Sequence, residues 1–126
     1  MKSDSEKLDF IYQYIMAQNQ PASEQPKPDL PFEVAEQDAG IMSWDEAMKK
    51  YDGSVDGWRL PTKDELNLIY KNRDKIPGLN LSGSHPAGWY WSSTPSYDDL
   101  AYDQRFSDGA QSDFLRNLDS SVRCVR

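Results

Sequence analysis

The chain has 126 residues, of which 37% are hydrophobic and 12% aromatic, which suits one compact domain with an appendage. Its formal net charge of −7 disfavours non-specific binding to nucleic acid or to an anionic membrane, because like charges repel. Residues 1–60 hold 12 acidic and 6 basic side chains and residues 61–126 hold 9 and 8, so the acidity is concentrated in the first half.

Cysteine content and the first residues point to a cellular location. The single cysteine, Cys124, cannot form a disulfide within the chain. The first 20 residues mix charges with tyrosine and glutamine and lack the apolar segment of a signal peptide. No apolar run is long enough to cross a membrane. These features favour the cytoplasm, with a phage particle as the other location.

A helix is expected over residues 1–19, because apolar side chains recur there at helical spacing. An isolated helix of this length is marginal in water, so its apolar stripe must pack against something. We expect it to support a homo-oligomer or attachment to a partner. The stripe consists of Leu8, Ile11, Tyr12 and Ile15.

A proline-rich linker is expected over residues 20–31, which contain four prolines and almost no large apolar side chain. The remaining residues, 32–126, are expected to form the folded domain. Two capping-box sequences, Ser43–Glu46 and Thr62–Glu65, each predict the start of a helix in this domain. The second helix should stop before Pro77.

Five strands are expected in the same domain, which makes the fold α+β. Period-2 alternation places Trp89 and Trp91 on one face of a strand and Tyr90 on the other. Asp103 and Arg105 should likewise share one face. The predicted strands are Phe32–Ala35, Gly88–Thr94, Ala101–Ser107, Phe114–Asn117 and Val122–Arg126.

A series of short motifs occurs in a characteristic order between residues 40 and 126. The chain there resembles a bacterial and phage domain family named after the C-terminal domain of a collagen-like adhesin. The motifs that carry the resemblance are Ser43–Ala47, Gly57–Thr62, Glu65-Leu66, Tyr90–Thr94, Phe106–Gly109 and Val122–Arg126.

The resemblance implies a C-type-lectin-like fold, in which two helices pack beside a small twisted antiparallel sheet and the chain ends lie close together. Relatives of this kind include adhesin tips that bind polysaccharides, variable receptor-binding proteins and the formylglycine-generating enzyme. Within the motifs, Trp58 and Leu60 are expected to pack under the second helix as architectural residues. Arg59 is expected to hold backbone carbonyls or an acid near that helix.

Catalytic and metal chemistry is poorly represented in the sequence. His85 is the only histidine, and a loop residue before Pro86 is its simplest interpretation. A single cysteine does not fit the paired-cysteine chemistry of the formylglycine-generating relatives, and Cys124 is expected to be buried and inert. We therefore expect no enzyme, no cofactor and no metal. One possible calcium site remains, with Asp98, Asp99, Asp103 and Asp108 as ligands, against the simpler interpretation of a solvated acidic loop.

Two functions are compatible with these features. The first is a non-catalytic module that binds a polysaccharide or protein receptor. The second is a phage or prophage inhibitor of a host factor, acting through its acidic surface as a nucleic-acid mimic or as an anti-defence protein. Tyrosine and arginine are enriched where proteins bind partners. The expected ligand surface is an exposed row that consists of Tyr97, Asp103, Arg105, Ser112, Arg116 and Asn117.

Overall fold

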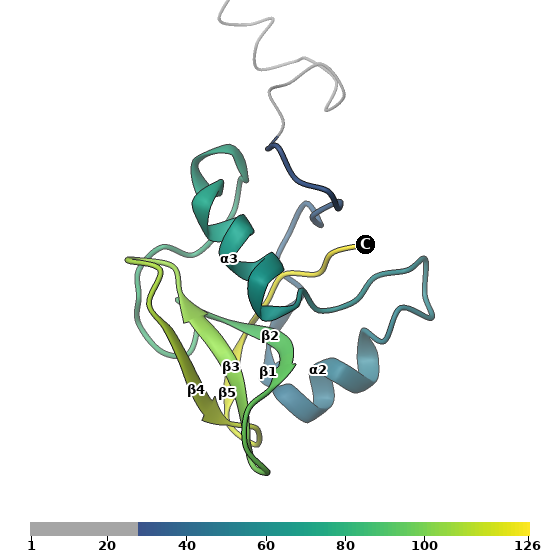
Figure 1. The fold of residues 1–126 in the computed structure, drawn as a ribbon, viewed down its shortest axis with the longest axis vertical. Helices are drawn as coiled ribbons and strands as arrows, with labels where there is room; N and C mark the ends of the chain where they lie inside the picture. Colours follow the sequence, from purple (N-terminus) through teal and green to yellow (C-terminus); the bar gives the residue numbers. More distant parts are fainter. Residues whose placement is uncertain (1–27) are drawn as a thin grey trace, which may run out of the picture.

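The computed structural model describes residues 28–126, and these form a small α+β fold (Figure 1). The predicted N-terminal helix and residues 20–27 of the linker lie outside the described residues. The elements are β1 (Gly40–Ser43), α2 (Trp44–Lys50), α3 (Lys63–Lys71), the 3-10 helix η2 (Arg73–Lys75), β2 (Trp89–Pro95), β3 (Leu100–Arg105), β4 (Gln111–Leu115) and β5 (Asp119–Val122).

The five strands form one mixed sheet in the order β1-β5-β2-β3-β4. The β2 and β5 strands are parallel, and every other neighbouring pair is antiparallel. A register shift interrupts β2 between Trp91 and Pro95. The hydroxyl of Ser92 donates to Tyr102 O and accepts from Thr94 N there, so side chains satisfy the backbone groups that the ladder leaves free.

Both helices begin where the sequence predicts. The Thr62 side chain accepts a hydrogen bond from Glu65 N while the Glu65 carboxylate accepts from Thr62 N, which completes a capping box at α3. At α2 the Ser43 hydroxyl accepts from Glu46 N, but the Glu46 carboxylate pairs with Lys50 instead of returning to the cap. Hence only one of the two hydrogen bonds of the predicted capping box is formed at α2.

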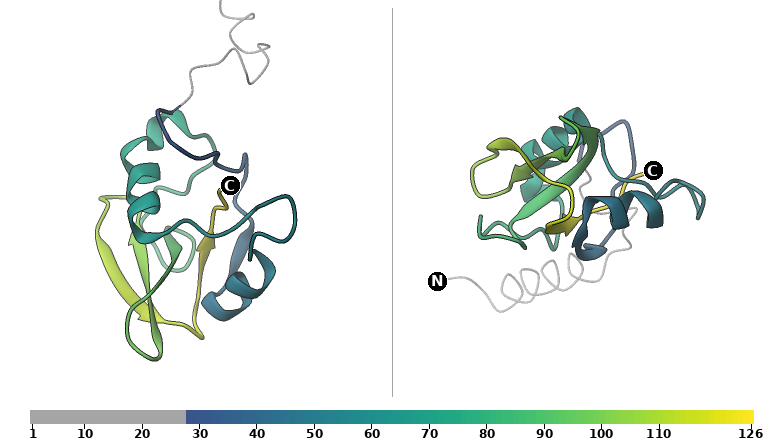
Figure 2. Two further views of the ribbon diagram at one scale, coloured as in Figure 1. Left: turned by 45° about the vertical axis from the view of Figure 1, so that its right-hand side comes forward. Right: turned by 90° about the horizontal axis from the view of Figure 1, so that it is seen from below.

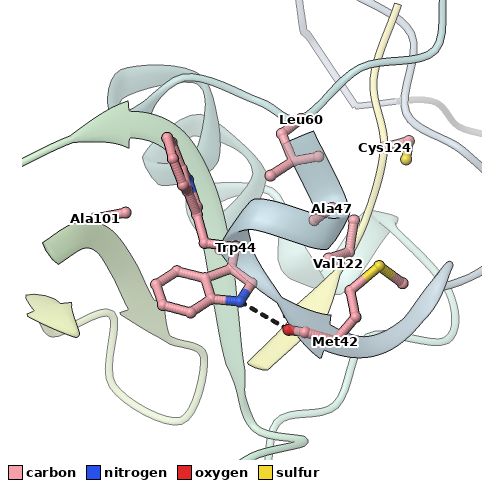
Figure 3. Close-up of a cluster of buried hydrophobic side chains, with 8 residues drawn as sticks. Met42, Trp44, Ala47, Leu60, Ala101, Val122 and Cys124 are labelled. Atoms are coloured by element: carbon pink, nitrogen blue, oxygen red, sulfur yellow. Dashed lines mark hydrogen bonds between the residues drawn. The ribbon is translucent and has the colours of Figure 1, made fainter. Parts of the chain in front are cut away.

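The two helices cover opposite faces of the sheet and create two apolar clusters (Figure 2). Figure 3 shows the cluster beneath α2. In this cluster the Trp91 indole donates to Met42 O at 3.0 Å. The cluster beneath α3 gathers around Tyr90 and Phe106. Trp91 and Tyr90 therefore lie on opposite faces, as the alternation in β2 predicts.

Trp58 and Leu60 correct one expectation, because both belong to the α2 cluster and not to the cluster under the second helix. Arg59 behaves as expected. Its guanidinium donates to both carboxylate oxygens of Glu65 at 2.7 and 2.9 Å and to the carbonyl of Leu60.

Three predicted strands differ from the observed ones. Phe32–Ala35 contributes a single bridge between Val34 and Val125, and the strand in this region is β1. β4 lies three residues earlier than predicted, because its first residues are polar and exposed and carry no alternation signal. β5 ends at Val122, where closure was expected to begin.

The C-terminal segment holds the beginning and the end of the described chain together. Glu33 and Arg126 exchange two backbone hydrogen bonds at 2.8 and 3.0 Å. Val125 and Arg59 exchange another two on the opposite side of the same segment. The last residues thus lie between the segment that enters the domain and the motif that precedes α3, which closes the fold.

Candidate functional site

The face of β2, β3 and β4 that does not carry α3 has an acidic side chain at its centre. In the ladder Asp103 lies opposite Trp91 on β2 and opposite Ser112 on β4. Paired residues in an antiparallel ladder point to the same side of the sheet. Asp103 therefore points to the side of Trp91 and away from α3.

A stack of three aromatic rings crosses this face. His85, from the segment between η2 and β2, is stacked between Trp89 and Phe114 with ring centroids 4.7 Å from each. Trp89 lies opposite Arg105 and Phe114 lies opposite Ala101, the two β3 neighbours of Asp103 on this face. The line from Trp89 to Phe114 consequently passes over Asp103, with the His85 ring in the middle.

This cover makes Asp103 an unusual carboxylate. The residue is 2% exposed, and neither of its carboxylate oxygens has a hydrogen-bond partner among residues 28–126. Burial raises its pKa to about 7, with a further contribution from the negative charge of Asp113. A buried carboxylate without a hydrogen-bond partner is costly to ionise, which is the physical cause of the raised pKa.

Exposed polar groups border the covered carboxylate. Arg105 extends over the Trp89 ring, with its guanidinium carbon 5.3 Å from the ring centroid, and forms an ion pair with Asp108 at 2.6 Å. That pair holds the pKa of Asp108 down at about 2. Ser112 is exposed on the edge strand β4. Arg105 and Ser112 can thus meet a ligand without any rearrangement.

Only three of the six residues of the expected ligand row lie together on this face. Asp103, Arg105 and Ser112 come together on this face, although Asp103 is buried and not exposed as expected. Arg116 lies elsewhere, where it pairs with Asp45 at 2.6 Å and stacks on Trp44. The remaining two residues are exposed in the turns at β2–β3 and β4–β5; they are Tyr97 and Asn117.

A separate apolar pocket opens between α2 and the C-terminal segment, with a volume of about 310 Å³. Trp58 lines it and is half-buried, with the Arg126 guanidinium over its ring at 4.3 Å. The wall also includes Tyr51, Val55 and Cys124. Trp58 is therefore accessible from one side, unlike the fully buried Trp91.

The sequence offered two candidates for chemistry, the thiol of Cys124 and a set of four possible calcium ligands. Cys124 is free and 4% exposed, and burial raises its pKa to about 11, so the thiolate needed for nucleophilic attack is strongly disfavoured. Within the described part of the chain, no three His, Cys, Asp or Glu side chains gather in a way that could hold a metal ion. Asp103 and Asp108, two of the four possible calcium ligands, are respectively buried under aromatic rings and paired with Arg105.

Sequence reasoning missed three residues of this site. His85 and Phe114 are far apart in the chain and reach the same place only through the loop and the β3–β4 hairpin. Trp89 was placed on the correct face but not connected with them. A usable signal exists, because a single histidine in a loop directly before an aromatic strand is in reach of that strand's side chains.

Comparison with known protein families identifies the family to which this chain belongs. Residues 18–126 match the Lcl C-terminal domain, so the chain belongs to that family. No curated protein matches the chain. Among residues 28–126, no helix is long and apolar enough to cross a membrane.

Proposed function

We propose that this protein is a non-catalytic module that binds a receptor, either a polysaccharide or a protein, through the face built around Asp103. The observation that carries the proposal is the buried, unpartnered carboxylate beneath the His85 stack, flanked by the exposed side chains of Arg105 and Ser112. Adhesin-like character, which the Lcl C-terminal domain family implies, agrees with a binding role.

A C-type-lectin-like fold is the architecture that we propose for the domain. Two features support it. Two short helices accompany a small twisted sheet (Figure 1), and the backbone pairing of Glu33 with Arg126 holds the two ends of the domain together. A fold does not by itself define a function, so function must be argued from the site itself.

Binding is a better explanation than catalysis for the groups on this face. The thiol of Cys124, the single cysteine, is buried in the α2 cluster and its pKa is raised, so it is a poor nucleophile. Aromatic rings and arginine are instead among the side chains that dominate the energetics of interfaces.

The test measures binding of the full chain to immobilised polysaccharides and to a panel of cell-surface proteins. Arg105→Ala should weaken binding by about tenfold, as expected for an interfacial arginine. Arg73→Ala is the matched control, because Arg73 also stacks on an aromatic ring, that of Tyr70, but belongs to the segment after α3. Equal affinities of the parent and Arg105→Ala would rule out this face as the receptor site.

We also propose that the stripe Leu8, Ile11, Tyr12 and Ile15 joins copies of the chain or attaches the domain to a partner, which leaves the Asp103 face free. The test is light scattering on the full chain and on the double variant Ile11→Asp/Ile15→Asp, with Gln13→Ala as control. A parent and a double variant of the same mass would contradict self-association.

A further inference from the structure

We propose that the space between Trp89 and Phe114 is a binding slot for the guanidinium group of an arginine on a protein receptor, and that the His85 ring occupies this slot when no receptor is bound. The inference rests on the proposed function, because it names the group that the Asp103 face receives. It makes the receptor a protein.

The width and shape of the slot support a flat occupant. His85 is nearly parallel to Trp89, with 10° between the ring planes, and makes 24° with Phe114. Removing the imidazole would leave two roughly parallel aromatic walls separated by about twice the 4.7 Å stacking distance. A planar group stacks between such walls with both of its faces in contact, whereas a tetrahedral ammonium cannot.

Charge decides which flat group fits. The floor of the slot is Asp103, a carboxylate whose two oxygens have no hydrogen-bond partner among residues 28–126. A guanidinium presents parallel N–H donors that match the two oxygens of a carboxylate, and it is attracted to aromatic faces as a cation. One occupant would thereby satisfy both orphaned oxygens and keep both stacking contacts.

His85 is suited to be a removable substitute for that group. Its imidazole is flat and aromatic, but it forms no hydrogen bond to Asp103, so it covers the carboxylate without satisfying it. His85 is also exposed. An arginine can therefore compete for the position by forming bonds that the histidine does not form.

The loop that carries His85 is held against the sheet by packing, since Gly83 lies close to Ser107 and Arg105, and its own hydrogen bonds are local. The hydrogen bonds of residues 82–86 join this loop to its own ends: Ser84 N donates to Ser82 Oγ, Gly88 N to Ser84 O and Trp89 N to Pro86 O. The sheet anchors the loop one residue later, where the Ser121 hydroxyl donates to Ala87 O. Displacing the tip would give up the packing of Gly83 and the stacking of His85, whereas the hydrogen bonds that pair β2 with β3 do not involve the tip.

The experiment titrates the full chain at pH 8 with N-acetyl-arginine amide and follows the indole N–H signal of Trp89 by NMR. N-acetyl-citrulline amide has the same shape without the charge, and N-acetyl-lysine amide has the charge without the plane. Saturable shifts are expected with the arginine probe at concentrations where the other two produce little change. Equal shifts with citrulline, or stronger binding of the lysine probe, would overturn the inference.

Three variants separate the slot from general effects on folding. His85→Ala should bind the arginine probe at least threefold more tightly, because the competing ring is gone. Asp103→Asn should bind it at least tenfold more weakly, whereas Asp99→Asn, which changes an exposed carboxylate in the β2–β3 turn, should behave like the parent. Phe114→Leu removes one of the two aromatic walls of the slot and should also weaken binding of the arginine probe. An unchanged affinity in His85→Ala or in a folded Asp103→Asn would refute the slot.

The outcome is distinct from that of the proposed function. A chain that binds a receptor through Arg105 but ignores the arginine probe would leave the binding function standing and reject the slot. A chain that binds the arginine probe with the predicted variant pattern, but no receptor in the panel, would support the slot while the receptor-binding proposal fails its own test.

Discussion

Each face of the sheet buries a charged residue, and the two residues differ in their hydrogen bonds. On the α3 side, the Arg123 side chain is fully buried and donates to Asp38 at 2.7 Å and to the carbonyls of Ala35 and Pro77. Tyr90 adds its hydroxyl to the same carboxylate at 2.7 Å. On the other face, Asp103 is equally buried, and its carboxylate has no hydrogen-bond partner within the described part of the chain.

This difference distinguishes Arg123, which holds the fold together, from Asp103, the residue of the candidate site. Arg123 leaves one nitrogen, Nη2, without a partner, but its other donors tie together segments that are distant in sequence. A buried ion that is hydrogen-bonded on several sides holds a fold together once the fold has formed. A buried carboxylate without a side-chain partner among residues 28–126 adds no such ties, which agrees with the proposal that a ligand completes it.

The largest expected effect comes from breaking the satisfied network. Arg123→Ala should lower the free energy of unfolding by about 3–5 kcal/mol, because it leaves the Asp38 carboxylate without its cation and removes a large buried side chain. Denaturant unfolding of the parent and of Arg123→Ala measures this loss of unfolding free energy. Arg126→Ala is the matched control, since its exposed pair with Glu33 should contribute less than about 1 kcal/mol. Similar losses in both variants would contradict the assignment.

Neutralising the unsatisfied acid should have the opposite sign. The pKa of Asp103 rises from 3.8 to about 7 on folding, so ionisation costs nothing below pH 3.8, costs progressively more as the pH rises, and reaches its full cost above pH 7. Asp103→Asn should therefore be more stable than the parent by about 2–4 kcal/mol at pH 8 and nearly equal to it at pH 4.

The measurement is thermal or denaturant unfolding of the parent and Asp103→Asn at both pH values. Other charged groups surround this position, namely His85, Arg105 and Asp113. Because they are present in both proteins, the difference between the two curves isolates Asp103. A variant that loses stability at pH 8 would show that the carboxylate has a partner after all.

A smaller loss is expected at the pocket beside α2. Trp58→Ala should cost about 1–3 kcal/mol, less than a fully buried tryptophan, because Trp58 is half-buried and already borders open space. Trp91→Ala provides the comparison, since Trp91 is fully buried in the same cluster and should cost about 3–5 kcal/mol. Thermal unfolding of both variants measures the difference. If Trp58→Ala were less stable than Trp91→Ala, this interpretation would be wrong.

The smallest expected effects concern the helix caps. Thr62→Ala breaks the complete capping box of α3 and should cost about 1 kcal/mol. Ser43→Ala breaks the half-box of α2 and should cost less, because Glu46 there makes no return bond to the cap. Urea unfolding of the two variants measures the difference, and a larger loss in Ser43→Ala would contradict it.

Local chemistry in the sequence determined much of this protein. The capping sequences begin both helices where expected, because a cap is formed by residues three positions apart. Alternation placed Trp91 and Tyr90 on opposite faces, and the motifs identified the family. The bond from Arg59 to Glu65 was also predictable, since a helix N-terminus six residues away brings the two together.

Only the tertiary structure decided what the candidate site is. β4 begins with Gln111, Ser112 and Asp113, which have no hydrophobic signal, so pairing with β3 and not propensity makes this segment a strand. That pairing brings Phe114 to His85 across 29 positions of sequence and buries Asp103 beneath them. Burial and the absence of a partner are properties of the assembled face, because they depend on residues that meet only when the chain has folded.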